Sequence, residues 1–139
     1  MADTLDDLKR NLQSLANSIS SKLNERQGYL DKADEIQKVC DRLARDKKTI
    51  KEYRNDIVYF YKESYNEFKG DNYKYTYKPS IQDLRDSYDD VISNIDINLD
   101  ALNNQILSYK NKASGCLGSL GYMQIAYNSV KTQIQNWTN

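Results

Sequence analysis

The chain has 139 residues, 29% of them charged, and 20 basic residues balance 20 acidic ones. A chain of this length suits one domain, but 5 glycines and 1 proline provide few turns, which is typical of long exposed helices. The balanced charge excludes the basic surface that nucleic-acid binding needs, and the lack of histidine excludes histidine-based catalysis and histidine-ligated metals.

The chain also lacks the roughly 20 consecutive apolar residues that span a bilayer. Residues 1–10 are acidic and polar, whereas a secretory signal is basic and then apolar. We therefore expect a protein made in the cytoplasm, without stable membrane insertion and without a cleaved signal peptide. Neighbouring carboxylates such as Asp89 and Asp90 are expected on solvated helix faces, so we predict no enzyme, no cofactor and no metal site.

The first predicted helix covers about residues 4–68, and Thr4 with Asp7 forms a weaker version of a capping box at its start. Two interleaved sets of residues repeat every seven positions along it. One set is Leu5, Leu12, Ile19, Arg26, Ala33, Cys40, Lys47, Arg54, Tyr61 and Phe68, and the other is Leu8, Leu15, Lys22, Tyr29, Ile36, Leu43, Ile50 and Ile57. This pattern predicts a coiled-coil-like seam with a few charged interruptions.

A connection at about residues 69–80 follows, where Gly70, Asp71 and Asn72 are turn formers. Tyr73, Tyr75 and Tyr77 alternate with other residues in this segment. Two interpretations stay open: an exposed aromatic and basic tip that touches a partner, or a solvated loop.

The second predicted helix covers about residues 81–137, with Ser80 as its cap and Pro79 just outside it. Every seventh residue is apolar: Ile81, Tyr88, Ile95, Leu102, Tyr109, Cys116, Met123, Val130 and Trp137. A companion set begins at Leu84 and Val91 and then moves by one residue to Leu99, Ile106, Ala113, Leu120, Tyr127 and Ile134. Gly115, Gly118 and Gly121 predict either a flexible or kinked interruption near 115–121 or a close approach of another helix.

Two helices of nearly equal length joined by a short link predict an all-α protein, in which residues 1–139 form a single long antiparallel two-helix hairpin. Centring the pairing on the connection places Cys40 opposite Ser108 and Cys116 opposite Lys32. The two cysteines would then be too far apart for a disulfide, so we predict two reduced thiols in the core.

Further apolar residues lie beside the seam. They are Leu23, Leu30, Val39, Tyr53, Val58 and Tyr65 on the first helix, and Ile92, Ile97, Leu107, Leu117 and Ile125 on the second. Two helices alone leave part of such a wide stripe in water, which predicts a partner helix pair that covers it. The alternative is that these residues only broaden the seam.

Three segments resemble a known family: LNERQGYLDKADEIQK at residues 23–38, FKG at 68–70 and LRDSYDDVISNIDINLDAL at 84–102. They are similar to the small helical EsxC-like and YwqH-like proteins that accompany LXG-type toxins in type VIIb secretion systems of Gram-positive bacteria. These belong to the WXG-type class, in which a turn bearing Trp-x-Gly joins two helices. Phe68 and Gly70 would occupy the Trp and Gly places of that turn.

The resemblance implies a non-enzymatic adaptor or targeting chaperone that binds the helical region of an LXG-type toxin, with a second small helical protein as a further candidate partner. The residues that we expect at the partner interface are Leu23, Arg26, Gly28, Tyr29, Leu30, Phe68, Gly70, Ile95, Leu102 and Leu117. The export signal of this class, a tyrosine followed four residues later by an acid near the C-terminus, is absent. The chain would therefore leave through a type VII system with its partner or stay in the cell.

A second hypothesis is a self-assembling structural coiled coil, in which two copies form a homodimeric helical bundle. It needs only the seam pattern and no toxin.

Overall fold

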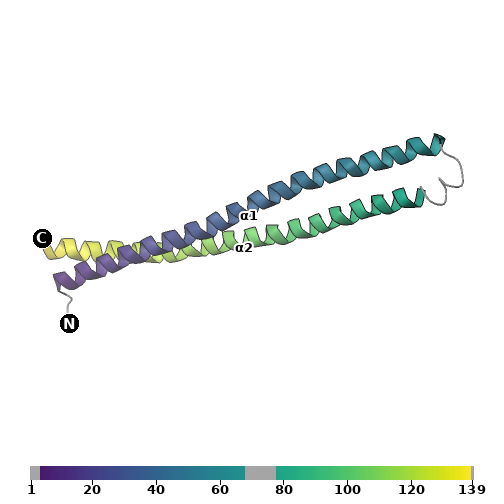
Figure 1. The fold of residues 1–139 in the computed structure, drawn as a ribbon. Helices are drawn as coiled ribbons and strands as arrows, with labels where there is room; N and C mark the ends of the chain where they lie inside the picture. Colours follow the sequence, from purple (N-terminus) through teal and green to yellow (C-terminus); the bar gives the residue numbers. More distant parts are fainter. Residues whose placement is uncertain (1–3, 68–77, 139) are drawn as a thin grey trace. The chain divides into compact units, whose positions relative to one another are not determined.

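The computed structural model describes residues 4–67 and 78–138. They form two helices, α1 (Leu5–Glu67) and α2 (Lys78–Thr138), and this described part contains no strand. The helices pack side by side and run in opposite directions (Figure 1). The predicted all-α two-helix hairpin is therefore confirmed. Most of the predicted connection, including Tyr73, Tyr75 and Tyr77, lies outside the described residues.

The start of α1 is the predicted capping box. The backbone N–H of Thr4 donates to Asp7 Oδ2 at 3.2 Å, and the backbone N–H of Asp7 donates to Thr4 Oγ1 at 3.1 Å. Each bond satisfies an N–H group that has no partner inside the first turn. Hydrogen bonds from the side chain and the backbone N–H of Thr4 to the carboxylate hold the pKa of Asp7 below its ordinary value, because they stabilise the charged form.

The start of α2 differs from the prediction by three residues. The helix begins at Lys78, so Pro79 and Ser80 lie within its first turn and not before it. The first turn accepts proline, because N–H groups there have no helical partner and the fixed φ of proline suits a helix. Pro79 suggested the end of the connection, but proline is also one of the residues best suited to the first turn of a helix.

Of the two interpretations of Gly115, Gly118 and Gly121, the interruption of α2 near residues 115–121 is excluded. The helix is continuous from Lys78 to Thr138, through Gly115, Gly118 and Gly121. A Cβ atom added to any of these glycines would meet nothing within 4 Å. The glycines are therefore not required for a close approach of α1 to α2.

The hairpin divides into two compact units. Unit 1 comprises Met1–Glu35 with Gln105–Asn139, and unit 2 comprises Ile36–Asn104. Each unit thus contains one segment of α1 and one segment of α2.

In unit 1 the seam is buried at the predicted seven-residue spacing. Its most buried side chains are Leu8, Ala33, Ile106, Ala113 and Cys116. The rings of Tyr29 and Tyr109 stack with their centroids 6.3 Å apart. Ala33 and Ala113, each four residues after one of these tyrosines, are only 2% exposed, so the seam is closely filled there.

In unit 2 the seam is closed by apolar residues and by ion pairs between the helices. Cys40 and Ile95 are buried. Lys47 Nζ lies 2.5 Å from Asp96 Oδ1, and the Arg54 guanidinium pairs with Asp89. Both acids belong to α2 and both bases to α1, so each pair fixes the same antiparallel register.

The predicted register between the helices is wrong by five residues of α2 at Cys40, because Cys40 faces Asn103 and not Ser108. Cys40 Sγ lies 3.8 Å from Asn103 Oδ1, whereas the prediction placed it opposite Ser108. Centring the helices on their connection ignored the seam, in which ion pairs and the size of facing side chains select the register. Cys40 and Cys116 are both free and buried, so the prediction of two reduced thiols is confirmed.

The companion set of α2 does not move by one residue. Arg85 and Ile92 are partly buried, while Leu84 and Val91 beside them are exposed. Arg85 and Ile92 stand at the same seven-residue spacing as Leu99, so one uninterrupted repeat runs along the helix.

Two neighbouring residues of unit 1 test this assignment of the seam. Ile106 is 6% exposed and Leu107 is 57% exposed. We expect Ile106→Ala to lower the free energy of unfolding by about 2 kcal/mol or more, because it leaves a cavity in the seam. Leu107→Ala should change it by about 0.5 kcal/mol at most. Urea denaturation followed by circular dichroism measures both, and equal losses would contradict the seam assignment.

Candidate partner-binding faces

The residues predicted for partner binding divide into seam and surface positions. Ile95 is buried and Leu102 is partly buried in the seam of unit 2, so both support the hairpin itself. Leu23 and Leu117 are 50% and 51% exposed in unit 1. Phe68 and Gly70 lie outside the described residues.

The remaining four predicted positions lie on the α1 segment of unit 1. Arg26, Tyr29 and Leu30 are partly buried along the seam, and Gly28 is exposed. A Cβ at Gly28 would meet nothing within 4 Å, so no side chain packs closely on it within this chain.

We define the unit 1 apolar face as Leu23, Leu30 and Leu117. Each of these leucines directly follows a seam residue, Lys22, Tyr29 and Cys116 respectively. In an antiparallel helix pair, residues that take this heptad position on the two helices flank the seam on the same side. One side of unit 1 therefore presents leucines from both helices, two of which are about half exposed.

The opposite side of unit 1 is charged. Lys22 Nζ donates to Glu25 Oε2 at 2.8 Å, and the Tyr29 hydroxyl donates to Glu25 Oε1 at 3.3 Å. Lys32 Nζ lies 5.5 Å and Lys112 Nζ 5.3 Å from the centre of the Tyr109 ring. This side is therefore occupied by interactions within the chain.

Protonation in this cluster follows from its contacts. Glu25 raises the pKa of Lys22 by accepting its hydrogen bond, and the bond lowers the pKa of Glu25 in turn. The negative charge of Glu25 is also the main cause that raises the pKa of Tyr29. Cys116 adds a weaker contribution to the raised pKa of both Lys22 and Tyr29, which places it opposite the turn of α1 between them.

Arg26 occupies that turn, and it shares a buried, unpartnered Nε with Arg85 of unit 2. Arg85 pairs through its Nη2 with Asp86, whereas Arg26 has no ion pair among the described residues. Its Nε atom is buried and finds no hydrogen-bond partner within residues 4–67 and 78–138. Lys22, Lys47 and Arg54 each pair with a carboxylate.

We define the unit 2 apolar face as Val39, Tyr53, Leu84 and Val91, which are 43% to 55% exposed. Each directly precedes a seam residue, so all four lie on one side of unit 2. The ion pairs of Lys47 and Arg54 involve Asp96 and Asp89, which directly follow seam residues and so lie on the other side. Unit 2 thus also has one apolar and one charged side.

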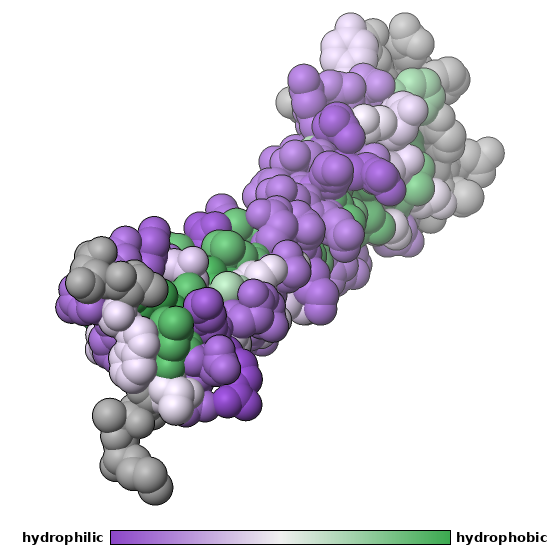
Figure 2. Space-filling model, turned by 90° about the vertical axis from the view of Figure 1, so that its left-hand side faces the viewer, coloured by the Kyte–Doolittle hydropathy of each residue, from purple (hydrophilic) through white to green (hydrophobic). Residues whose placement is uncertain are grey.

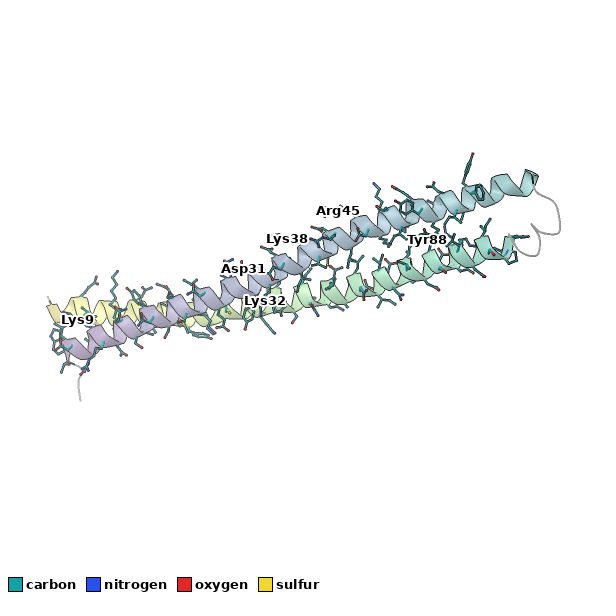
Figure 3. The ribbon with its side chains drawn as sticks, viewed as in Figure 1. Lys9, Asp31, Lys32, Lys38, Arg45 and Tyr88 are labelled. Carbon is teal, nitrogen blue, oxygen red and sulfur yellow. The ribbon has the colours of Figure 1, made fainter. Side chains whose placement is uncertain are left out.

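Views of the surface agree with this description. Figure 2 shows hydrophobic side chains that reach the surface between hydrophilic ones. In Figure 3, Lys38 and Arg45 point from α1 away from α2, and Tyr88 points from α2 toward α1. Lys38 and Arg45 thus lie on the back of α1, but the surface away from the seam is not polar throughout, since Ile97 of α2 is 65% exposed.

The described part of the chain offers neither a metal site nor a membrane-spanning helix. It contains no group of three or more His, Cys, Asp or Glu side chains that could hold a metal ion. Neither α1 nor α2 is apolar enough over its described length to cross a membrane.

No protein family, curated protein or solved structure matches the chain. The similarity to WXG-type proteins therefore stays a prediction.

Sequence reasoning missed Leu84 and Val91 as surface residues because it assigned them to the seam. The signal that identifies the true seam is Ile92, which stands seven residues before Leu99 in the unbroken repeat. An apolar residue directly before a seam position is easily taken for the seam itself.

The Glu25 cluster predicts how stability changes with pH. Because the pKa of Glu25 is lower in the folded chain, its contribution to stability is present above the ordinary value of 4.5. It is lost as the pH falls through the lower pKa of the folded state. We expect the wild type to melt at a higher temperature than Glu25→Gln at about pH 6, and the difference to vanish near pH 2.

Thermal melting across this pH range measures the effect. Glu35→Gln, which changes an exposed glutamate of the same helix, is the control and should follow the wild type. A difference between wild type and Glu25→Gln that persists in acid would contradict the role of the carboxylate charge.

Proposed function

We propose that the chain is a non-enzymatic protein-binding adaptor, which packs its exposed apolar faces against helices of a larger protein. One observation carries this proposal. The seam between α1 and α2 is already filled, yet each unit keeps a second set of apolar side chains exposed on one side of it. Covering such side chains with partner helices removes apolar surface from water.

The size of the exposed side chains makes this contact significant. Burying a fully exposed Val, Leu or similar side chain contributes about 1.5–3 kcal/mol. Six residues of the two faces are about half exposed, so covering each of them contributes roughly half of that energy. Part of that energy offsets the entropy lost on association. Aromatic side chains such as Tyr53 are typical anchors of protein interfaces.

The position of the charged residues also favours partner helices on the apolar faces. Each apolar face lies on the side of the seam opposite to the ion pairs and the Glu25 cluster. A helix that lies on the apolar side therefore does not have to break these interactions. Depletion of charge at the centre of a contact is typical of protein interfaces.

The helical region of an LXG-type toxin is the candidate partner. This choice rests on the resemblance of residues 23–38, 68–70 and 84–102 to WXG-type proteins of type VIIb secretion systems. In that role the chain would be a targeting chaperone that presents the toxin to the secretion machinery, alone or with a second small helical protein. It would leave the cell with the toxin or remain in the cytoplasm.

The proposal is tested by co-expression with the N-terminal helical region of an LXG-type toxin from the same genome. Size-exclusion chromatography with light scattering then measures the mass of the complex. We expect Val91→Lys to weaken binding at least about 10-fold, because it places a charge on the unit 2 apolar face. Asn94→Lys, three residues further along α2 at an exposed polar position, is the matched control and should bind as the wild type does.

Two outcomes would contradict the proposal. If both variants bind the toxin region like the wild type, the unit 2 apolar face is not the interface. If the wild type forms a stable homodimer that Val91→Lys dissociates, and it ignores the toxin region, the self-assembling structural coiled coil is the better reading.

A further inference from the structure

Arg26 is a cation without an anion in the seam of unit 1. Its buried Nε has no hydrogen-bond partner, and its guanidinium forms no ion pair with any residue of the described chain. Arg26 as a whole is partly buried, but burying its Nε–H without a partner costs free energy, because the water that solvated this group has been removed and nothing replaces it. A leucine at this heptad position would fill the seam without that cost.

The nearest carboxylates are already used. Glu25 accepts hydrogen bonds from Lys22 and Tyr29 on the charged side of the unit. Asp31 accepts a hydrogen bond from Gln27 Nε2 at 2.8 Å.

The facing helix has no carboxylate to offer. The sequence from Ala101 to Asn139 contains neither Asp nor Glu, but it contains Lys110, Lys112 and Lys131. This stretch includes the whole α2 segment of unit 1. No carboxylate of the described part of unit 1 therefore pairs with Arg26, and the facing helix cannot supply one.

The position of Arg26 shows which side such an anion would approach. Leu23 stands three residues before Arg26 and Leu30 four residues after it, so the three side chains share one stripe of α1. Leu117 follows Cys116, which lies opposite the turn that carries Arg26. The guanidinium therefore borders the unit 1 apolar face.

We propose that the unit 1 apolar face docks one helix of a partner protein, and that an Asp or Glu within the apolar stripe of this helix binds the Arg26 guanidinium. Leu23, Leu30 and Leu117 would pack against the apolar residues that surround the carboxylate. The guanidinium fork matches a carboxylate with two parallel hydrogen bonds, which gives the contact a fixed register. This inference rests on the proposed function and adds the chemistry that the partner helix must have.

The same charges argue against a second copy of this chain as the occupant. Two copies that met through their unit 1 apolar faces would bring one Arg26 toward the other. The α2 segments beside them would add lysines and no carboxylate. Like charges facing each other at low dielectric constant repel, so this face favours a different protein.

The test compares Arg26→Met with the wild type in two measurements. Methionine keeps the length of the side chain and removes the charge. In the isolated chain we expect Arg26→Met to raise the melting temperature by roughly 2–5 °C, because the buried, unpaired Nε–H is gone and an apolar side chain takes the seam position. In the complex with the toxin helical region we expect binding to weaken at least about 30-fold, because the partner carboxylate loses its cation.

Arg45→Met is the matched control. Arg45 is exposed in unit 2 and points away from α2 (Figure 3), so its loss should change neither quantity appreciably. A variant that becomes more stable and yet binds more weakly separates a binding role from a structural one. If Arg26→Met lowers stability and binding together, Arg26 only supports the hairpin and the inference is wrong.

A second measurement does not depend on the choice of toxin. A displayed library of amphipathic helices, identical except for one varied position in the centre of the apolar stripe, is selected on the wild type and on Arg26→Met. We expect Asp and Glu to be enriched on the wild type alone. Enrichment of helices without an acid, or no enrichment on either protein, would overturn the inference.

The outcomes separate the inference from the proposed function. If the chain binds the toxin region and Arg26→Met leaves this binding unchanged, the inference is wrong and the adaptor proposal stands. If the wild type selects helices with an acidic residue but does not bind the toxin region, the inference stands and that toxin is rejected as the partner.

Discussion

The seven-residue repeat that buries one stripe of α1 against one stripe of α2 is the interaction on which the other features depend. With 63 and 61 residues, these helices are far longer than an isolated helix of mixed composition can sustain by hydrogen bonding alone. Burial of the seam supplies the missing stabilisation, and the buried residues recur at the required spacing in both units. The ion pairs of Lys47 and Arg54 with α2 then select one register among the many that a repetitive seam permits.

A two-helix seam leaves each helix with flanks that belong neither to the core nor to the back of the helix. Here the two flanks of each unit differ in chemistry. In unit 2, Arg54 and Asp89 lie on one flank and Tyr53 and Val91 on the other. Each unit resembles half of a four-helix bundle, because its apolar flank has the form that a second helix pair covers in such bundles.

How much of this arrangement follows from the sequence depends on the range of the interaction. The seam of α1, the capping box of Thr4 and Asp7 and the reduced thiols follow from local spacing and were predicted. The pairing of Cys40 with Asn103 was not, because register depends on how facing side chains fit across two segments far apart in the chain. The boundary near Pro79 was misjudged because proline suits both the end of a loop and the first turn of a helix.

The candidate faces show the same limit. Leu23 and Leu117 were predicted correctly as apolar residues beside the seam, since their distance from seam positions can be read along one helix. The isolation of Arg26 could not be read in this way. It depends on Glu25 turning toward Lys22 and Tyr29, and one-dimensional spacing does not say to which side a glutamate turns.

The two cysteines have a use that their burial creates. Cys116 belongs to unit 1 and Cys40 to unit 2, and both are free and buried. A buried thiol reacts with an alkylating reagent only when the surrounding structure opens, so its labelling rate reports the free energy of local opening. The chain therefore carries one natural probe in each unit. Mass spectrometry of the labelled peptides can follow which unit opens first, and which one a bound partner protects, without any substitution in the sequence.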